Sequence, residues 1–242
     1  MNYLNSISDF FKSPKWVTNL LLAGLCTFIP IVGPMVVLGW LITGFWCRPN
    51  ATPETFPDFD FAHFGKWLER GLWPMLVALA VSVGMYVVFV IPMILVMGLM
   101  GALVGAGAAQ GPRGAGLLGG LGTLMILGLE VFVMLIILVV LKPLMLRASL
   151  TQDFVKAFDL GFIRQFIALT WVELVLSALF TCVASWFLAL AGLLALCVGV
   201  LLVPGLIYFM MAHLDQQLYR LYLSRGGEPI PLSPKLTGTV GS

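Results

Sequence analysis

Residues 71–112 read GLWPMLVALAVSVGMYVVFVIPMILVMGLMGALVGAGAAQGP, a run of 42 residues without one charged side chain. A helix needs about 20 apolar residues to cross roughly 30 Å of hydrocarbon, so this run is longer than one membrane span. Comparable charge-free runs occupy 16–47, 114–141 around a lone Glu130, and 174–212. These regions predict the fold class, which is an all-α integral membrane protein.

The composition points the same way. Of the 242 residues, 60% are hydrophobic and only 10% are charged, whereas an average soluble domain has about 25% charged residues. Because a soluble domain of this size needs a charged surface, the composition excludes a soluble globular enzyme, a disordered chain and a nucleic-acid binder. The net charge of +2 is too small to imply an anionic partner. The four cysteines are widely spaced and do not form the pattern of a disulfide framework.

The first apolar run, 16–47, follows a short N-terminal interfacial helix and is broken near its middle by Pro30, Gly33 and Pro34. Two half-helices of about 14 residues would each reach roughly 20 Å. That length suits a re-entrant hairpin shielded by protein. A single kinked span is the alternative. We favour the hairpin because it leaves the N-terminus and its two lysines in the cytoplasm, as the positive-inside rule requires.

Four further membrane spans are predicted to follow the broken segment. Within the first of them, Pro74 lies in the opening turn and Pro92 is expected to introduce a kink. A tight turn at 190–192 is expected to join the last two. The basic residues of the segments that flank these spans place both chain termini in the cytoplasm. The spans are predicted over 72–97, 122–142, 167–188 and 193–213.

Glycines crowd the segment 98–121, which we expect to be a loop. The alternative is a helix, in which Gly101-x3-Gly105 and Gly116-x3-Gly120 would serve as close-packing motifs. Residues 1–225 then form a single membrane domain. Residues 226–242, rich in glycine and proline, are expected to be a flexible tail.

Two cytoplasmic segments, 56–70 and 153–166, resemble each other and each leads into a span. Both contain Phe-Asp followed by an aromatic, mixed-charge helix, which suggests two related pairs of spans. Asp60 is expected to be a helix N-cap, and Ser149 with Gln152 a capping box. Such helices lie at the membrane interface, either as a structural collar, which we favour, or as a lipid-sensing or docking element. The interfacial residues predicted here are Phe59, Asp60, Phe64, Trp67, Phe154, Phe158, Asp159 and Phe162.

Four motifs follow one another along the chain. They are Ile-Pro-Ile-Val-Gly at 29–33, Phe-Pro-Asp-Phe-Asp…Phe-Gly at 56–65, Ala-Phe-Asp-Leu at 157–160, and the closing pattern from Gly199 to Arg220. In these motifs the chain resembles a widespread prokaryotic family of integral membrane proteins known only as a domain of unknown function. The similarity covers roughly residues 10 to 225. The resemblance implies a multi-helix domain of the prokaryotic cytoplasmic membrane and no established activity.

Glu130 and Glu173 are the polar candidates inside predicted spans. An ionised carboxylate at the membrane centre costs about 2.5–3.5 kcal/mol on insertion scales, so each is expected to be protonated or paired. A proton or cation relay, or a substrate contact, is one interpretation. The other, which we favour, is a neutral carboxyl that joins helices by hydrogen bonds to Thr123, Ser177 or a backbone carbonyl.

No catalytic residue, metal site or cofactor is predicted. The chain lacks Gly-x-Ser-x-Gly, His-Glu-x-x-His and Walker motifs. A cluster of His63, His213 and Asp215 would give three metal ligands, but a hydrated helix end explains these residues adequately.

Two functional classes remain open. A non-enzymatic scaffold or accessory subunit is slightly favoured, because no polar line runs through the predicted spans. A homo-oligomeric pore or transporter using Glu130 is the alternative, because broken helices are common where ions bind. The expected partners are membrane lipids and either further copies of the chain or another membrane subunit, with no nucleic acid.

Overall fold

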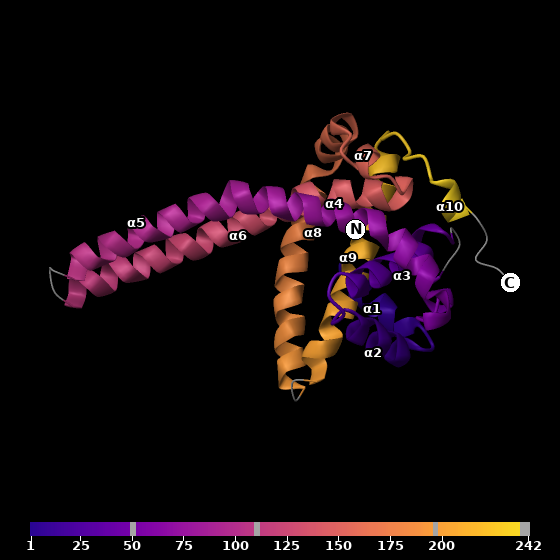
Figure 1. Ribbon diagram of the computed structural model, residues 1–242, viewed down its shortest axis with the longest axis horizontal. Coiled ribbons are helices and arrows are strands. Elements are labelled where there is room, and N and C mark those ends of the chain that lie inside the picture. Colours follow the sequence, from indigo (N-terminus) through magenta and orange to yellow (C-terminus); the bar gives the residue numbers. More distant parts are fainter. Residues whose placement is uncertain (49–51, 109–111, 196–197, 238–242) are drawn as a thin grey trace. The chain divides into compact units, whose positions relative to one another are not determined.

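Helices form nearly all of the computed structural model, which describes residues 1–48, 52–108, 112–195 and 198–237 (Figure 1). No strand occurs within these ranges. The α-helices are α1 Asn5–Ser8, α2 Trp16–Cys26, α3 Val32–Trp46, α4 Phe64–Met85, α5 Ile91–Ala108, α6 Pro112–Thr151, α7 Phe154–Ala157, α8 Leu160–Leu194, α9 Val198–Ser224 and α10 Pro234–Thr237. Shorter turns are η1 Asp9–Lys12, η2 Pro53–Thr55 and η3 Phe61–His63, and η4 Tyr86–Val90 is a π-helical turn.

The chain divides into two compact units. We call Met1–Ala78 with Lys142–Ser242 the bundle unit, and Leu79–Leu141 the hairpin unit. Three helical stretches, Phe61–Ala102, Gly119–Thr151 and Phe154–Leu194, are long and apolar enough to cross a membrane. The fourth expected span, 193–213, includes residues 196–197, which lie outside the described part of the chain.

The proline-broken segment forms two separate short helices, as expected. At 1.5 Å per residue, the 11 residues of α2 and the 15 of α3 reach about 16 and 22 Å, less than the roughly 30 Å of a bilayer core. Between them Ile31 has φ 66° and ψ −57°, and the amide of Val32 donates to the carbonyl of Pro30 at 2.7 Å. This is a γ-turn of the rare, strained kind.

Gly33 is required just after that turn. A Cβ at this position would lie 1.7 Å from the carbonyl oxygen of Cys26, so only glycine allows the start of α3 to pack against the end of α2. The sequence signal of Pro30, Gly33 and Pro34 therefore corresponds to a real change of chain direction.

An aromatic core fills the bundle unit between α3, α9 and the segment before α4. Trp40 is fully buried and makes edge contacts with Phe56 and Phe59, with both centroid distances 5.3 Å. Phe209 of α9 packs against Phe56 at 5.2 Å. Since α9 also packs on α1, α2 and α8, it is the central helix of this unit.

The predicted interfacial residues are placed differently from the expectation. Phe59, Trp67 and Phe162 were expected to dip into the acyl boundary, but they are buried within the protein, at 3–6% exposure. Their rings find protein partners instead: Phe59 contacts Trp67 at 4.9 Å, and Phe162 contacts Tyr222 at 5.6 Å. Phe158 is exposed, and Phe64 and Phe154 are half-buried.

The predicted capping box of Ser149 and Gln152 is wrong. Both residues are buried, and Ser149 belongs to the last turn of α6, which runs to Thr151. Gln152 has φ 52° and ends that helix. The helix expected within 153–166 is divided between α7 and α8, and the side chains of Asp153 and Asp159 cap the two starts. Asp60 is an N-cap as expected, and its carboxylate accepts from the amide of Ala62 at 2.9 Å.

The glycine-rich segment is helical in its described part, not a loop. Residues 98–108 continue α5, and 112–121 open α6. A helix satisfies its own backbone hydrogen bonds, and in apolar surroundings this outweighs the cost of about 1 kcal/mol for each helical glycine. A Cβ at any glycine of the two predicted motifs would meet nothing within 4 Å, so these motifs pack against no part of the described chain.

The remaining span boundaries also shift. α4 begins at Phe64, so Pro74 lies inside it rather than in its opening turn. The helix continues through η4 into α5, and the π-helical turn lies just before Pro92, whose missing N–H leaves the carbonyl four residues earlier without its usual partner. The turn expected at 190–192 is still helical, because α8 extends to Leu194.

The tail expected to be flexible is docked on the bundle unit over 226–237. Ile230 and Leu236 are buried. The amide of Ile230 donates to the hydroxyl of Tyr219 at 2.8 Å, and the amide of Ser233 donates to the carbonyl of Leu150 at 2.9 Å. We call residues 228–237 the C-terminal strap. Two apolar anchors in a polar, proline-rich segment are a weak sequence signal, which explains why composition alone indicated a mobile tail.

Candidate functional site

Glu173 has a partner that the sequence did not indicate. Its carboxylate forms a two-pronged ion pair with Arg225, with one contact of 2.9 Å, across 52 residues of sequence. Neither of the two expected hydroxyl groups binds it. The hydroxyl of Thr123 donates to the carbonyl of Gly119, and the hydroxyl of Ser177 is buried with no hydrogen-bond partner in the described structure. Glu173 therefore fixes α8 to the end of α9.

Glu130 lies on α6 in the hairpin unit and is exposed. Among the described residues it takes part in no hydrogen bond or ion pair. Its neighbours along the helix, Val131 and Phe132, are exposed apolar side chains. The carboxyl thus lies among exposed apolar side chains, and the expected hydrogen bond to a hydroxyl or a backbone carbonyl is not present in the described structure.

The three residues considered for a metal cluster have separate partners. His213 contacts Asp9 at 3.2 Å through one ring nitrogen and Gln217 at 2.9 Å through the other. Asp215 accepts from Lys142 at 2.7 Å. His63 stacks on Trp67 at a centroid distance of 5.9 Å. Within the described residues, no group of three or more His, Cys, Asp or Glu side chains could hold a metal ion.

The pair of Lys142 and Asp215 is largely removed from solvent. The side chain of Lys142 is 3% exposed and that of Asp215 is 19% exposed, and Lys142 is the first residue of the second stretch of the bundle unit. Burial raises the pKa of the Asp215 carboxyl, although the neighbouring ammonium of Lys142 acts in the opposite direction. Each charge therefore depends on the other for its solvation.

Arg70 is a second buried cation, and it binds oxygen atoms that carry no formal charge. Its guanidinium donates to the hydroxyl of Thr43 at 2.8 Å and to the carbonyl of Lys235 at 3.2 Å. Its own carbonyl accepts from the Gln152 side chain at 3.0 Å. Arg70 thereby connects α3, α4, the end of α6 and the C-terminal strap.

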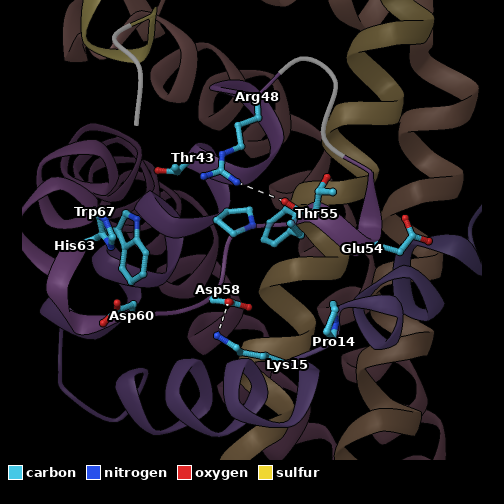
Figure 2. A pocket seen from close by; sticks show the side chains of 12 residues that line it. Pro14, Lys15, Thr43, Arg48, Glu54, Thr55, Asp58, Asp60, His63 and Trp67 are labelled. Carbon is cyan, nitrogen blue, oxygen red and sulfur yellow. Dashed lines mark hydrogen bonds and ion pairs between the residues drawn. The ribbon is translucent and has the colours of Figure 1, made fainter. Parts of the chain in front are cut away.

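A cavity of 590 Å³ opens beside α2 and α3 in the bundle unit (Figure 2). Pro14 and Lys15 line it from just before α2, while Thr43 and Arg48 line it from the end of α3. The chain thus leaves α3 close to where it entered α2, as a hairpin requires. The segment that precedes α4 and Trp67 in α4 supply the other walls. The charged and titratable side chains of the lining are Lys15, Arg48, Glu54, Asp58, Asp60 and His63.

Charges of both signs are separated around this cavity. Figure 2 shows Arg48 beside Thr55 at one end, and Asp58 paired with Lys15 at the other. The Lys15–Asp58 distance is 3.0 Å. The only hydrogen bond described for the Arg48 guanidinium is a long one, 3.4 Å, to the carbonyl of Thr55. Hydrogen bonds from its own backbone amide and from Thr52 lower the pKa of the exposed Glu54 carboxyl.

The cavity wall is held in place by two buried hydrogen bonds that the sequence did not predict. The indole of Trp40 donates to the carbonyl of Pro57 at 2.8 Å. The amide of Phe59 donates to the side chain of Asn19 at 2.8 Å. The sequence predicted only a capping role for Asp60. The alternation of buried Phe56 and Phe59 with exposed Asp58 and Asp60 was the available signal that one face of the segment is free.

Comparisons with known proteins give a family and no activity. Neither the curated proteins nor the solved structures contain a match to this chain. A family model does match, over residues 22–203, which covers α3 to α8 and parts of α2 and α9. The chain therefore belongs to the family described as protein of unknown function (DUF4013), in agreement with the resemblance drawn from its sequence.

Proposed function

We propose that this protein is a non-enzymatic membrane scaffold or accessory subunit, and that its hairpin unit binds another membrane polypeptide. The observation that carries the proposal is the exposed carboxyl of Glu130 on α6, whose neighbours along the helix, Val131 and Phe132, are exposed apolar side chains.

The hairpin unit offers a large apolar surface. Of its described side chains only Val81 and Gly122 are buried. The helices α5 and α6 lie side by side (Figure 1). A Cβ on Gly122 of α6 would lie 2.8 Å from the methyl carbon of Met100 of α5. The exposed side chains of the two helices include many Leu, Val and Met residues and Phe132. Such a surface suits the interior of a bilayer, where lipid or another helix covers it.

Glu130 argues for a protein partner on one side of that surface. A carboxylate facing lipid costs about 2.5–3.5 kcal/mol near the membrane centre, whereas a donor on another helix satisfies it. Met134 lies one turn along α6 on the same face as Glu130. Phe132 lies roughly 200° around the helix, on the opposite face. The proposal assigns the face of Glu130 to the partner and that of Phe132 to lipid.

The distribution of basic residues supports an orientation of the chain in the membrane. Basic residues gather in the segments 47–70 and 142–166 and after residue 213. By the positive-inside rule these segments, with both termini, face the cytoplasm of a prokaryotic cell. In that arrangement α2 and α3 enter from the cytoplasmic side as a re-entrant pair, and the long helices cross the membrane.

Site-specific photo-crosslinking in native membranes tests the proposal. A photoreactive residue at Met134 is expected to give a discrete protein adduct, and one at Phe132 is expected to give lipid adducts. Both positions are exposed, at 45% and 59%, so they form a matched pair. Glu130→Gln should weaken the Met134 adduct without changing expression. Equal protein capture at both positions, or none at either, would contradict the proposal.

A homo-oligomeric pore is the second candidate, and the same exposed carboxyl favours it. In that case the Met134 adduct would have the mass of two copies of this chain. Glu130→Gln would then abolish ion flux into proteoliposomes, whereas for a scaffold it would change only stability. An adduct containing a different polypeptide, with no flux in either form, would eliminate the pore.

A further inference from the structure

The 590 Å³ cavity beside α2 and α3 has no role in the proposed scaffold. Its volume lies within the range of about 300–1,000 Å³ that is typical of small-ligand sites. Its lining mixes two cations, three carboxylates and the aromatic surface of Trp67. A ligand for such walls must itself carry both signs of charge.

Arg48 provides the site for an anion. A guanidinium has five N–H donors in a planar fork that matches a phosphate. Only one of them has a hydrogen bond in the described structure, and that bond is long. The hydroxyl of Thr55 lies at the same end of the cavity (Figure 2), but it already donates to the carbonyl of Thr52 at 3.2 Å, so the anion site is the Arg48 guanidinium.

Asp58 and Asp60 provide the site for a cation. One carboxylate oxygen of Asp60 accepts from the amide of Ala62, and the second has no partner in the described structure. Asp58 is paired with Lys15, whose side chain is 64% exposed, so water weakens that pair. Because Glu54 adds a third carboxylate, a purely anionic ligand would meet more negative than positive charge.

The position of the cavity identifies the source of the ligand. Lys15 immediately precedes α2 and Arg48 follows α3 by two residues, so both ends of the short helix pair border the cavity. In the proposed membrane arrangement, on which this inference rests, the two ends of a re-entrant pair lie at one membrane surface. That layer contains phospholipid headgroups.

We infer that this cavity binds the headgroup of a phospholipid with a primary amine, phosphatidylethanolamine. Its phosphate lies at Arg48, and its ammonium donates to the carboxylates of Asp58 and Asp60. Phosphatidylcholine has the same charges but no N–H donor for the carboxylates. Phosphatidylglycerol has the phosphate but lacks the cation.

Native mass spectrometry of the full-length protein tests this. The protein is delipidated in detergent and titrated separately with the dioleoyl forms of phosphatidylethanolamine, phosphatidylcholine and phosphatidylglycerol. Wild-type protein is expected to bind one phosphatidylethanolamine about 10-fold more tightly than either of the others, because only its headgroup has an ammonium that donates hydrogen bonds to the carboxylates. Equal affinities for the three lipids would overturn the inference.

Two variants separate the two ends of the cavity. Arg48→Gln should weaken all three lipids about 10-fold, because all share the phosphate. Asp60→Asn should weaken phosphatidylethanolamine more than phosphatidylcholine, because only the first loses a hydrogen bond as well as the charge attraction, and should thereby reduce the preference between them. Asparagine can still cap the helix. Arg164→Gln, at an exposed position of α8 away from the cavity, is the control for charge. A loss as large in the control as in Arg48→Gln would also overturn the inference.

Competition with soluble O-phosphoethanolamine and with inorganic phosphate identifies the source of the ligand. Displacement of the lipid only by other lipids indicates a membrane ligand, as inferred. Displacement by millimolar O-phosphoethanolamine would assign the cavity to a soluble zwitterion instead. If the crosslinking test fails but the protein still selects phosphatidylethanolamine, only the scaffold proposal is wrong. If crosslinking succeeds but the lipid selectivity is absent, only the lipid site is wrong.

Discussion

Gly39 of α3 and Gly71 of α4 lie against each other's helix, with the backbones in direct contact. A Cβ on Gly39 would lie 1.8 Å from the carbonyl oxygen of Trp67, and a Cβ on Gly71 would lie 1.8 Å from the carbonyl oxygen of Met35. Each glycine thus leaves the space that the other helix fills. This contact attaches the proline-broken pair to the first long helix.

Gly39→Ala and Gly71→Ala are each expected to destabilise the protein by about 1–3 kcal/mol or more, because a methyl group has no space at either position. Gly65→Ala is the control, since a Cβ there meets nothing within 4 Å. It should be neutral or stabilise α4 by about 0.5–1 kcal/mol. Thermal unfolding in detergent measures all three. Equal shifts for Gly65→Ala and Gly71→Ala would show that the backbones are not in contact.

Ile31→Gly is expected to leave stability unchanged or to raise it. A β-branched residue at φ 66° is strained, and glycine adopts that conformation without the steric cost of about 1–2 kcal/mol. Little packing is lost, because Ile31 is 62% exposed. Ile29→Gly in the same loop is the control, since Ile29 has no positive φ and should be destabilised by glycine. The difference between their melting temperatures measures the strain.

Lys142→Met should be strongly destabilising, because it leaves the buried carboxylate of Asp215 without its ammonium. Breaking a buried pair in this way costs about 3–5 kcal/mol. The double variant Lys142→Met/Asp215→Leu should recover much of that loss, because it removes both charges. Chemical denaturation of the two variants measures the recovery. A double variant no more stable than the single one would contradict a pairwise contact.

The stability of Lys142→Met should also depend on pH. Burial already raises the pKa of Asp215, and removal of Lys142 removes the one cause that lowers it. A carboxyl with a raised folded-state pKa favours folding when protonated, and this contribution is lost as pH rises through that pKa. The deficit of the variant relative to wild type should therefore be smallest in acid and grow toward neutral pH. Denaturation at several pH values measures this trend.

The C-terminal strap should contribute to stability through its two anchors. Leu236→Ala is expected to cost about 2–5 kcal/mol, because Leu236 is 2% exposed. Leu232→Ala, four residues earlier and 47% exposed, should have little effect. Limited proteolysis of the tail provides a second readout, since loss of the anchor should make residues 226–237 accessible. A tail cleaved at the same rate in both variants would show that the anchor does not hold it.

Local signals in the sequence were sufficient for part of the fold. Pro30, Pro34 and Gly33 predicted the break between the two short helices, and Asp60 was predicted to be an N-cap. Both features depend on the backbone geometry of a few neighbouring residues. Helix ends such as Gln152 were missed, because a buried glutamine at positive φ has no local signature. The glycine-rich segment was predicted to be a loop because glycine has a low helix propensity in water. In apolar surroundings the need to satisfy backbone hydrogen bonds favours the helix instead.

Long-range polar pairs could not be predicted. Glu173 and Arg225 are 52 residues apart, and His213 and Asp9 are 204 apart. Residue type shows that a buried charge needs a partner but does not identify the partner. The cavity was missed for the same reason, since its walls come from four separate segments that only the fold brings together.

The position of α9 has a consequence for biosynthesis. Gly24 of α2 packs directly on the backbone of α9, since a Cβ there would lie 2.7 Å from the carbonyl oxygen of Leu201. The ribosome completes α2 long before it reaches α9. During most of translation the short helices therefore lack the surface on which they finally rest, and the contact between α2 and α9 cannot form until α9 has been made. Assembly of the bundle unit accordingly joins a helix made early to a helix made late.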